Sequence, residues 1–135
     1  MREPAYRAAH VSEIVAPTGA TGRATWHAVR MAFAIGSFGV NAYVAESGGD
    51  VFVSEHDETD TRHEELFFVA SGRATFTVAG ETIDAPAGTF VYVRDPAVVR
   101  GATAEEAGTT MLAIGGEPGR AYEVSQWERE YDPDG

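Results

Sequence analysis

The chain has 135 residues, of which 44% are hydrophobic, so it is long enough for a single domain with one core. Its 21 acidic and 10 basic residues give a net charge of −11, which disfavours nucleic acids and anionic membrane surfaces as partners. There is no cysteine, which excludes disulfides and thiolate metal sites, so any metal would need nitrogen and oxygen ligands.

The first ten residues, MREPAYRAAH, lack the apolar core of a signal peptide. The longest apolar runs, Met31–Ile35 and Leu66–Ala70, are much shorter than the roughly 20 residues that a membrane-spanning helix needs. We therefore expect a protein of the cytoplasm with no membrane partner.

From Thr25 onward, short runs rich in β-branched and aromatic residues alternate with glycine and proline turn signals. The expected strands are Thr25–Val29, Gly39–Glu46, Val51–His56, His63–Ala70, Ala74–Val78, Thr82–Asp84, Thr89–Val93, Val98–Thr103 and Thr109–Ile114. No long stretch has helical periodicity, and one short helical turn is expected near Ser125–Glu130. Many short, evenly spaced strands are typical of a sandwich or barrel, so we expect a single all-β domain over residues 1–135.

The segment SEHDETDTRHEELFFVASG, which begins at Ser54, carries the densest cluster of polar residues. Two histidines and six acidic residues lie in it before an apolar run begins. Along the expected strand, Glu65, Phe67 and Val69 share one face, and the opposite face is also apolar. The strand is therefore expected to be covered on both sides, and Glu65 needs a partner because an isolated buried carboxylate is costly.

The segment HEELFFVASGRATFTVAGETIDAPAGTFVYV resembles the cupin family, whose members are small jelly-roll β-barrels around a pocket. The family's first motif ends with a glutamate, six residues and a glycine, which match Glu65 to Gly72. Gly88 takes the first position of the second motif. The resemblance implies a single-domain jelly-roll β-barrel with a core over about 38–116, N-terminal strands within 8–30 and a tail over 117–135. It also implies a homodimer.

The cupin resemblance further implies a metal site built from histidines of both motifs and the motif glutamate, and the chain departs from that pattern. Val99 stands at the position of the second-motif histidine, and valine cannot bind a metal. At the usual spacing before Glu65, no histidine occupies the paired positions of the first motif. One of the usual ligands is therefore missing, and two others are found only if the loop is longer here.

With a longer loop, His56 and Glu58 take the paired positions and join Glu65 in a His/Glu/Glu set. Such a set suits a weakly bound divalent metal (Mn, Fe, Ni or Zn), with the harder manganese and iron preferred over zinc. A shift of one residue would instead turn Glu55 and Asp57 inward, because alternate residues of a strand face opposite sides. The sequence leaves these two registers open.

Acid–base catalysis is the alternative to metal chemistry. His63 and Glu65 are the candidate catalytic residues, since they lie two apart and share a face of the expected strand. The chain contains no lysine, which excludes Schiff-base chemistry through a lysine side chain. His63 has two further readings, as a replacement for the missing metal ligand and as a partner of a nearby acidic residue.

Four residues are candidates for contacting a substrate. Arg94 lies at the expected rim, where a guanidinium is suited to an anionic group, and a pair with Asp95 or with a neighbouring subunit is the alternative. Tyr43, Phe67 and Tyr92 are candidates for lining the pocket, with ordinary core packing as the alternative.

Two functional hypotheses from different classes remain. In the first, the chain is an enzyme that binds a small organic molecule and uses its His/Glu cluster for metal-assisted or acid–base chemistry. In the second, it is a non-catalytic cupin that binds a ligand or only dimerises. The cluster favours the first hypothesis, and Val99 favours the second.

Overall fold

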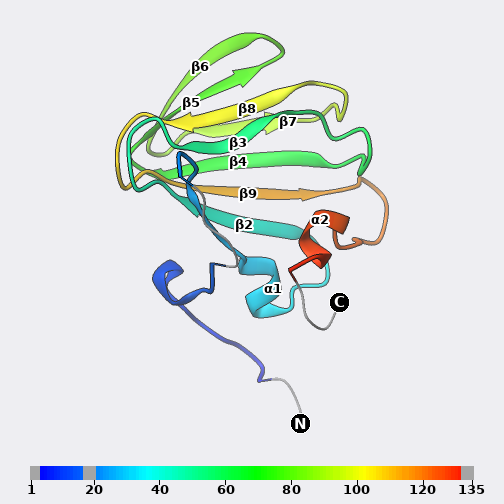
Figure 1. Cartoon of the computed structure of the whole chain (residues 1–135). Helices are drawn as coiled ribbons and strands as arrows, with labels where there is room; N and C mark the ends of the chain where they lie inside the picture. The colour runs from blue at the N-terminus through cyan, green and yellow to red at the C-terminus, as the bar shows by residue number, and fades with distance from the viewer. Residues whose placement is uncertain (1–3, 17–20, 132–135) are drawn as a thin grey trace.

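The computed structural model describes residues 4–16 and 21–131, which form two antiparallel β-sheets packed face to face (Figure 1). The five-stranded sheet has the order β1 (Thr25–His27), β2 (Gly39–Val44), β9 (Thr110–Gly116), β4 (Glu64–Ser71) and β7 (Phe90–Val93). The four-stranded sheet has the order β3 (Val51–His56), β8 (Arg100–Ala104), β5 (Arg73–Val78) and β6 (Glu81–Pro86). The expected all-β jelly-roll fold is confirmed, and each expected strand has a counterpart.

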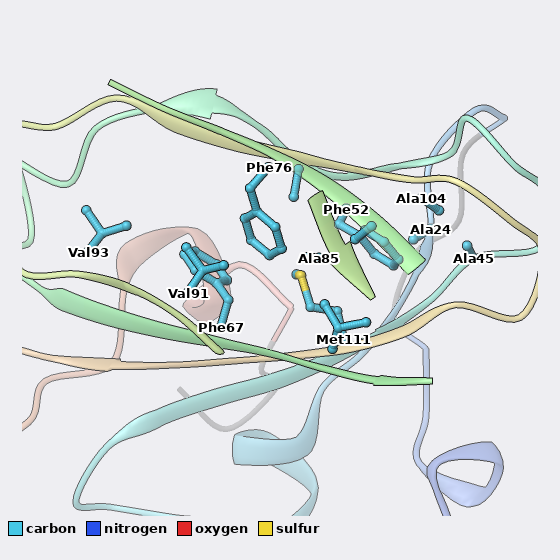
Figure 2. Packing of buried hydrophobic residues seen from close by; sticks show 13 residues of the cluster. Ala24, Ala45, Phe52, Phe67, Phe76, Ala85, Val91, Val93, Ala104 and Met111 are labelled. Atoms are coloured by element: carbon cyan, nitrogen blue, oxygen red, sulfur yellow. The ribbon is translucent and has the colours of Figure 1, made fainter. Parts of the chain in front are cut away.

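The core lies between the inner faces of the two sheets (Figure 2). Phe67 of β4 and Phe76 of β5 meet there, with ring centroids 5.4 Å apart, and each is about 1% exposed. Val69 and Met111 from neighbouring strands of the five-stranded sheet are completely buried beside them. These inward positions alternate with more exposed ones along each strand, as the pleat of a β-strand requires.

The N-terminal strands expected within 8–30 are largely absent from the described residues. Only Thr25–His27 form a strand there, Val11–Glu13 form the short 3-10 helix η1, and Val29 begins the helix α1 (Val29–Phe33). The expectation that a strand continues to Val29 is therefore wrong. The chain leaves extended geometry at Ala28, and Arg30 of α1 is buried against the C-terminal segment rather than paired in the sheet.

The helical turn expected near Ser125–Glu130 is present as α2 (Gln126–Arg129). Figure 1 shows α1 and α2 near β2. Arg30 Nε donates to Glu128 Oε1 at 2.7 Å, and both side chains are buried, so the two short helices are joined by an ion pair across 98 positions of sequence. No helix in the described part of the chain has the length and apolar character needed to cross a membrane.

Candidate functional site

A pocket of about 360 Å³ lies between the sheets and the C-terminal segment. Its apolar walls include the aromatic side chains of Trp26, Tyr43, Phe52, Phe67, Trp127 and Tyr131. Its polar lining consists of Arg23, Ser54, His56, Glu58 and Glu65. This volume and this mixture of aromatic walls with a few convergent polar groups are typical of small-molecule sites.

The space for the pocket comes from small residues on β9. Met111, Ala113 and Gly115 occupy alternate positions along this strand, so the side chain becomes smaller at each step. Ala113 is the register partner of Phe67, and Gly115 is the partner of Glu65. A Cβ atom at Gly115 would lie 3.3 Å from Glu65 Cγ and 3.0 Å from the carbonyl oxygen of Glu64. The absence of a side chain there therefore lets Glu65 lie close against the sheet.

Trp26, Trp127 and Tyr131 form an aromatic cluster where the C-terminal segment covers the pocket. The ring centroid of Trp26 lies 5.0 Å from that of Trp127 and 5.3 Å from that of Tyr131. Trp26 Nε1 is buried and has no hydrogen-bond partner among residues 4–16 and 21–131. The walls of the pocket therefore combine residues from both ends of the chain.

His56 and Glu58 both line the pocket, whereas Glu55 and Asp57 do not. His56 is the register partner of Arg100 across β3 and β8, after an irregularity that follows Val53. The structure thus decides the register that the sequence left open. It favours the arrangement in which the even-numbered residues of this segment face inward.

Both ring nitrogens of His56 face oxygen acceptors. Nδ1 lies 2.8 Å from the carbonyl oxygen of Ser54, and Nε2 lies 3.0 Å from Glu58 Oε1. Only the doubly protonated imidazolium can donate to both acceptors. Accordingly, the hydrogen bond with Glu58 raises the pKa of His56 above its usual 6.5. Burial acts to raise the pKa of Glu58, but hydrogen bonds from His56 and from Thr61 lower it below its usual value.

Glu65 lies at the same polar end and forms an ion pair with Arg100. Arg100 Nη1 donates to Glu65 Oε1 at 2.6 Å, and the arginine side chain is completely buried. Burial first and the nearby Glu58 carboxylate second raise the pKa of Glu65, and Arg100 opposes this rise without cancelling it. Oε2 of Glu65 has no hydrogen-bond partner within the described ranges.

Tyr43 contributes a further unpartnered polar atom to the pocket. Its hydroxyl makes no hydrogen bond within the described part of the chain. Burial first and the Glu65 carboxylate second raise the pKa of Tyr43. The phenol therefore keeps its proton at neutral pH and is available as a hydrogen-bond donor, while Glu65 Oε2 is available as an acceptor.

The His/Glu/Glu set suggested by the sequence does come together. One ligand atom from each of His56, Glu58 and Glu65 lies within 4.8 Å of the others. The three side chains already have partners: both His56 nitrogens face oxygen acceptors, Glu58 accepts from Thr61 and lies against His56, and Glu65 accepts from Arg100 through Oε1, which leaves Oε2 open. To bind an ion, His56 would have to lose a proton and its hydrogen bond to Glu58, and the ion would lie beside the buried guanidinium of Arg100, so the cluster with its present partners does not fit a metal ion.

The other predicted site residues lie in different places. His63 does not line the main pocket but an adjoining cavity of about 60 Å³, which shares Tyr43, Glu58 and Glu65 with that pocket. It also lines an open cavity of about 870 Å³ formed with the C-terminal segment, and its ring lies 5.8 Å from that of Tyr122. Phe67 and Tyr43 line the main pocket as expected, but Phe67 is also part of the core. A catalytic role for His63 stays a prediction.

Tyr92 and Arg94 do not line the pocket, which corrects the expectation that both face a substrate there. On β7 the inward positions belong to Val91 and Val93, so Tyr92 points outward and is 54% exposed. Its hydroxyl donates to Glu64 Oε1 at 2.7 Å on the outside of the sheet. Arg94 follows the end of β7 and is exposed.

Sequence reasoning missed Arg100 and the aromatic cluster. Arg100 had a detectable signal, because it shares a strand face with Val98 and Ala102, and an inward arginine needs a carboxylate just as an inward Glu65 needs a cation. Trp127 and Tyr131 had no comparable signal, since nothing local indicates which part of the barrel a C-terminal segment covers.

Comparison with known proteins identifies the fold. No family model and no curated protein matches the sequence. A cupin protein from Bacteroides fragilis is 18% identical, with a TM-score of 0.65, over 91% of this chain and 93% of that chain. KdgF from Halomonas sp. is 15% identical, with a TM-score of 0.55, over 67% of this chain and 74% of that chain. A putative sugar phosphate isomerase from Acidithiobacillus ferrooxidans is 20% identical, with a TM-score of 0.57, over 68% of this chain and 58% of that chain. At these identities the likeness shows the fold alone.

Proposed function

We propose that this chain, which has the cupin fold, binds a small organic molecule in the aromatic pocket and transfers a proton with Glu65. One observation carries the proposal: Glu65 is held through Oε1 by Arg100, while Oε2 has no partner in the described part of the chain and lies at the polar end of the pocket. A carboxylate that is fixed in orientation and still has a free oxygen is suited to general-base catalysis.

The walls indicate the kind of ligand. Aromatic side chains from β1, β2, β4 and the C-terminal segment surround the space, and such walls favour a flat ring by stacking and edge contacts. At the polar end, two cationic groups balance two carboxylates: His56 faces Glu58, and Arg100 faces Glu65. Arg23 adds a third cation to the lining, so the pocket suits an uncharged ligand or one that carries a single negative charge.

Two of the unpartnered groups, the Tyr43 hydroxyl and Glu65 Oε2, indicate the reaction class. The Tyr43 hydroxyl is a neutral donor suited to a ligand carbonyl oxygen, and Glu65 can take a proton from the carbon next to that carbonyl. The electron pair of the broken C–H bond then forms the C=C bond of an enol, with the developing charge on oxygen stabilised by Tyr43. Return of the proton to the same carbon exchanges its hydrogen with solvent. When the ligand has a second C=C bond conjugated with the enol, return of the proton to the far carbon moves that double bond and completes an isomerisation. The raised pKa of Glu65 makes it a stronger base than an ordinary carboxylate.

Metal-assisted chemistry is the second candidate, and the proximity of His56, Glu58 and Glu65 supports it. Manganese, iron, nickel or zinc are the ions that such a set would take. We place it second because His56 would have to give up a proton and its hydrogen bond to Glu58, and the ion would lie beside the cationic Arg100. The third possibility, ligand binding without catalysis, is an outcome of the experiment below.

The test is hydrogen exchange into a ligand. A panel of cyclic ketones and β-dicarbonyl compounds is incubated in D₂O with untagged protein and chelator, and deuterium at the carbon next to the carbonyl is measured by NMR. Wild type should accelerate exchange for at least one compound. Glu65→Gln should reduce the rate about 100-fold with binding retained. Glu64→Gln, whose side chain bonds Tyr92 outside the pocket, should behave as wild type.

Each other outcome is informative. Binding without any exchange identifies a non-catalytic ligand-binding protein. Exchange that survives Glu65→Gln shows that another group is the base. Exchange that the chelator abolishes and added metal restores overturns the proposal in favour of the metal-assisted mechanism.

A further inference from the structure

Arg100 lies at the centre of the polar cluster rather than at its edge. Across β3 and β8 it is the register partner of His56, and its side chain is completely buried. Besides the bond to Glu65, Nε donates to the carbonyl oxygen of Val98 at 3.0 Å and Nη2 to that of Asp95 at 3.3 Å. Backbone carbonyls and a carboxylate thus hold the guanidinium in one orientation, as expected for a cation that belongs to the site.

The cluster needs compensating positive charge. Glu58 and Glu65 place two carboxylates close together in a partly buried site, where their mutual repulsion and desolvation both oppose ionisation. A divalent ion between them is one solution to this problem. Here the imidazolium of His56 and the guanidinium of Arg100 supply two positive charges in its stead.

We propose that Arg100 takes the place of a metal ion: it positions Glu65, keeps the His56–Glu58–Glu65 cluster free of divalent metal, and its loss converts the cluster into a metal site. An arginine keeps its proton at any pH that proteins withstand, so it cannot make room by becoming neutral. An ion that binds the open Oε2 of Glu65 would face the buried like charge of Arg100. The inference stands whether or not Glu65 transfers protons.

The residues that precede Arg100 offer no competing ligand. Val99 points out of the barrel and is 45% exposed, and Val98 has no donor atom in its side chain. If Arg100 is removed, three ligand atoms from His56, Glu58 and Glu65 remain within 4.8 Å of one another. Three protein ligands with water in the open positions are a common arrangement for a divalent ion.

The experiment measures binding of Mn²⁺, Co²⁺ and Zn²⁺ near neutral pH by isothermal titration calorimetry, with untagged wild type and Arg100→Met. Methionine keeps much of the side-chain length without the charge. The variant should bind one ion on the order of 100-fold more tightly than wild type. The heat should depend on the buffer, since His56 must release about one proton to become a ligand.

Two variants control this result. Arg73→Met also removes an arginine from an ion pair, but this pair, with Asp84, is exposed on β5 and β6 and should leave metal binding at the wild-type level. Adding Glu65→Gln to Arg100→Met should weaken the new site about 10-fold or more, because one carboxylate ligand is lost. Thermal melting with and without metal establishes that each variant is folded.

The inference is overturned if wild type binds one equivalent of ion as tightly as Arg100→Met, or if that variant folds and binds none. Should Arg100→Met fold only when metal is added, the inference is supported. Should it not fold at all, Arg100→Gln takes its place, and metal binding by wild type provides an independent test. If wild type binds one equivalent of metal and His56→Ala abolishes this binding, the inference is contradicted. If wild type binds no stoichiometric metal, the inference is supported. No substrate is used, so failure here leaves the proton-transfer proposal separately testable.

Discussion

His56 and Glu58 form an ion pair whose contribution to stability depends on pH. The pKa of His56 is raised in the folded protein by the hydrogen bond to Glu58, so folding is coupled to protonation of the imidazole. The contribution is fully present below the usual histidine pKa of 6.5 and is lost as the pH rises through the higher pKa of the folded state. The pair is partly exposed, with 40% exposure of the His56 side chain, which limits its size.

We therefore expect the free energy of unfolding of wild type, relative to His56→Gln, to fall by less than about 1 kcal/mol as pH rises from 6.5 through the folded pKa. Urea denaturation at a series of pH values measures this difference. Glu55→Gln, at an exposed neighbouring position outside the pocket, serves as the control and should retain the wild-type dependence. A difference that rises with pH would show that the imidazolium is not stabilised by the fold.

At the scale of elements, the turn between β4 and β5 depends on Gly72, the last residue of the glutamate–glycine motif. Gly72 has a φ of +75°, which favours glycine, and a Cβ atom there would lie 2.7 Å from Thr109 Cα. Thr109 is completely buried and bonds the backbone of Arg73 and of Glu106. The glycine is therefore required both for the turn conformation and for the close approach of the segment before β9.

Gly72→Ala should lower the free energy of unfolding by about 3 kcal/mol, because strain from the positive φ adds to overpacking against Thr109. Gly80→Ala is a matched control, since Gly80 has a φ of +78° with no atom within 4 Å of the added Cβ. It should cost only about 1 kcal/mol. Chemical denaturation of both variants makes the comparison, and equal losses would show that the contact with Thr109 is unimportant.

The helices α1 and α2 are joined by the buried ion pair of Arg30 and Glu128. Glu128 lies next to Trp127 in α2 and three residues before Tyr131, and both aromatic residues line the pocket. The ion pair therefore fixes the position of Trp127 and Tyr131. Removing one partner of a buried ion pair leaves a charge in an environment that solvates it poorly. The C-terminal cover of the pocket is thus expected to depend on the Arg30–Glu128 ion pair.

Glu128→Gln should lower the free energy of unfolding by about 3 kcal/mol and expose the tryptophan cluster, which shifts its fluorescence to longer wavelength. Glu130→Gln, an exposed glutamate just after the same helix, should change neither quantity. Denaturant unfolding followed by tryptophan fluorescence measures both effects. Wild-type stability and spectrum for Glu128→Gln would show that the C-terminal segment is held by its aromatic contacts instead.

For the whole molecule, we propose that two chains associate as a homodimer. Phe90 and Tyr92 project from β7, at the edge of the five-stranded sheet, with 64% and 54% exposure. The ring centroid of Phe68 on β4 lies 4.5 Å from that of Phe90, so the outer face carries a continuous aromatic patch beside an unpaired strand edge. Association would bury the aromatic patch and cover the unpaired edge of β7.

Light scattering at micromolar concentration should give twice the chain mass of 14.4 kDa. Phe90→Glu should shift the protein to monomer, because it places a charge in the centre of the proposed interface. Tyr6→Glu is the control, since Tyr6 is 86% exposed near the N-terminus and should leave the mass unchanged. A monomeric wild type contradicts the proposal, and a dimer that survives Phe90→Glu places the interface elsewhere.

The sequence by itself determined the architecture of this protein. Strand positions followed from alternating apolar residues and from turn residues whose backbone preferences are local, so each expected strand from Gly39 onward appears within a few residues of its predicted ends. The same alternation placed Glu65 and Phe67 on an inward face. The proximity of His56, Glu58 and Glu65 was also within reach, because all three lie close together in the sequence.

The tertiary structure alone decided what those residues do to one another. The partner of Glu65 is Arg100, 35 positions away, and the wall of the pocket joins Trp26 to Trp127, so both contacts depend on how distant segments pack. The register of β3 was likewise decided by its pairing with β8, where an irregularity after Val53 sets which residues face inward. Local pattern specifies which face a side chain takes. Which charge or ring it meets there is set by packing between segments, because those contacts form only when the two sheets and the C-terminal segment come together.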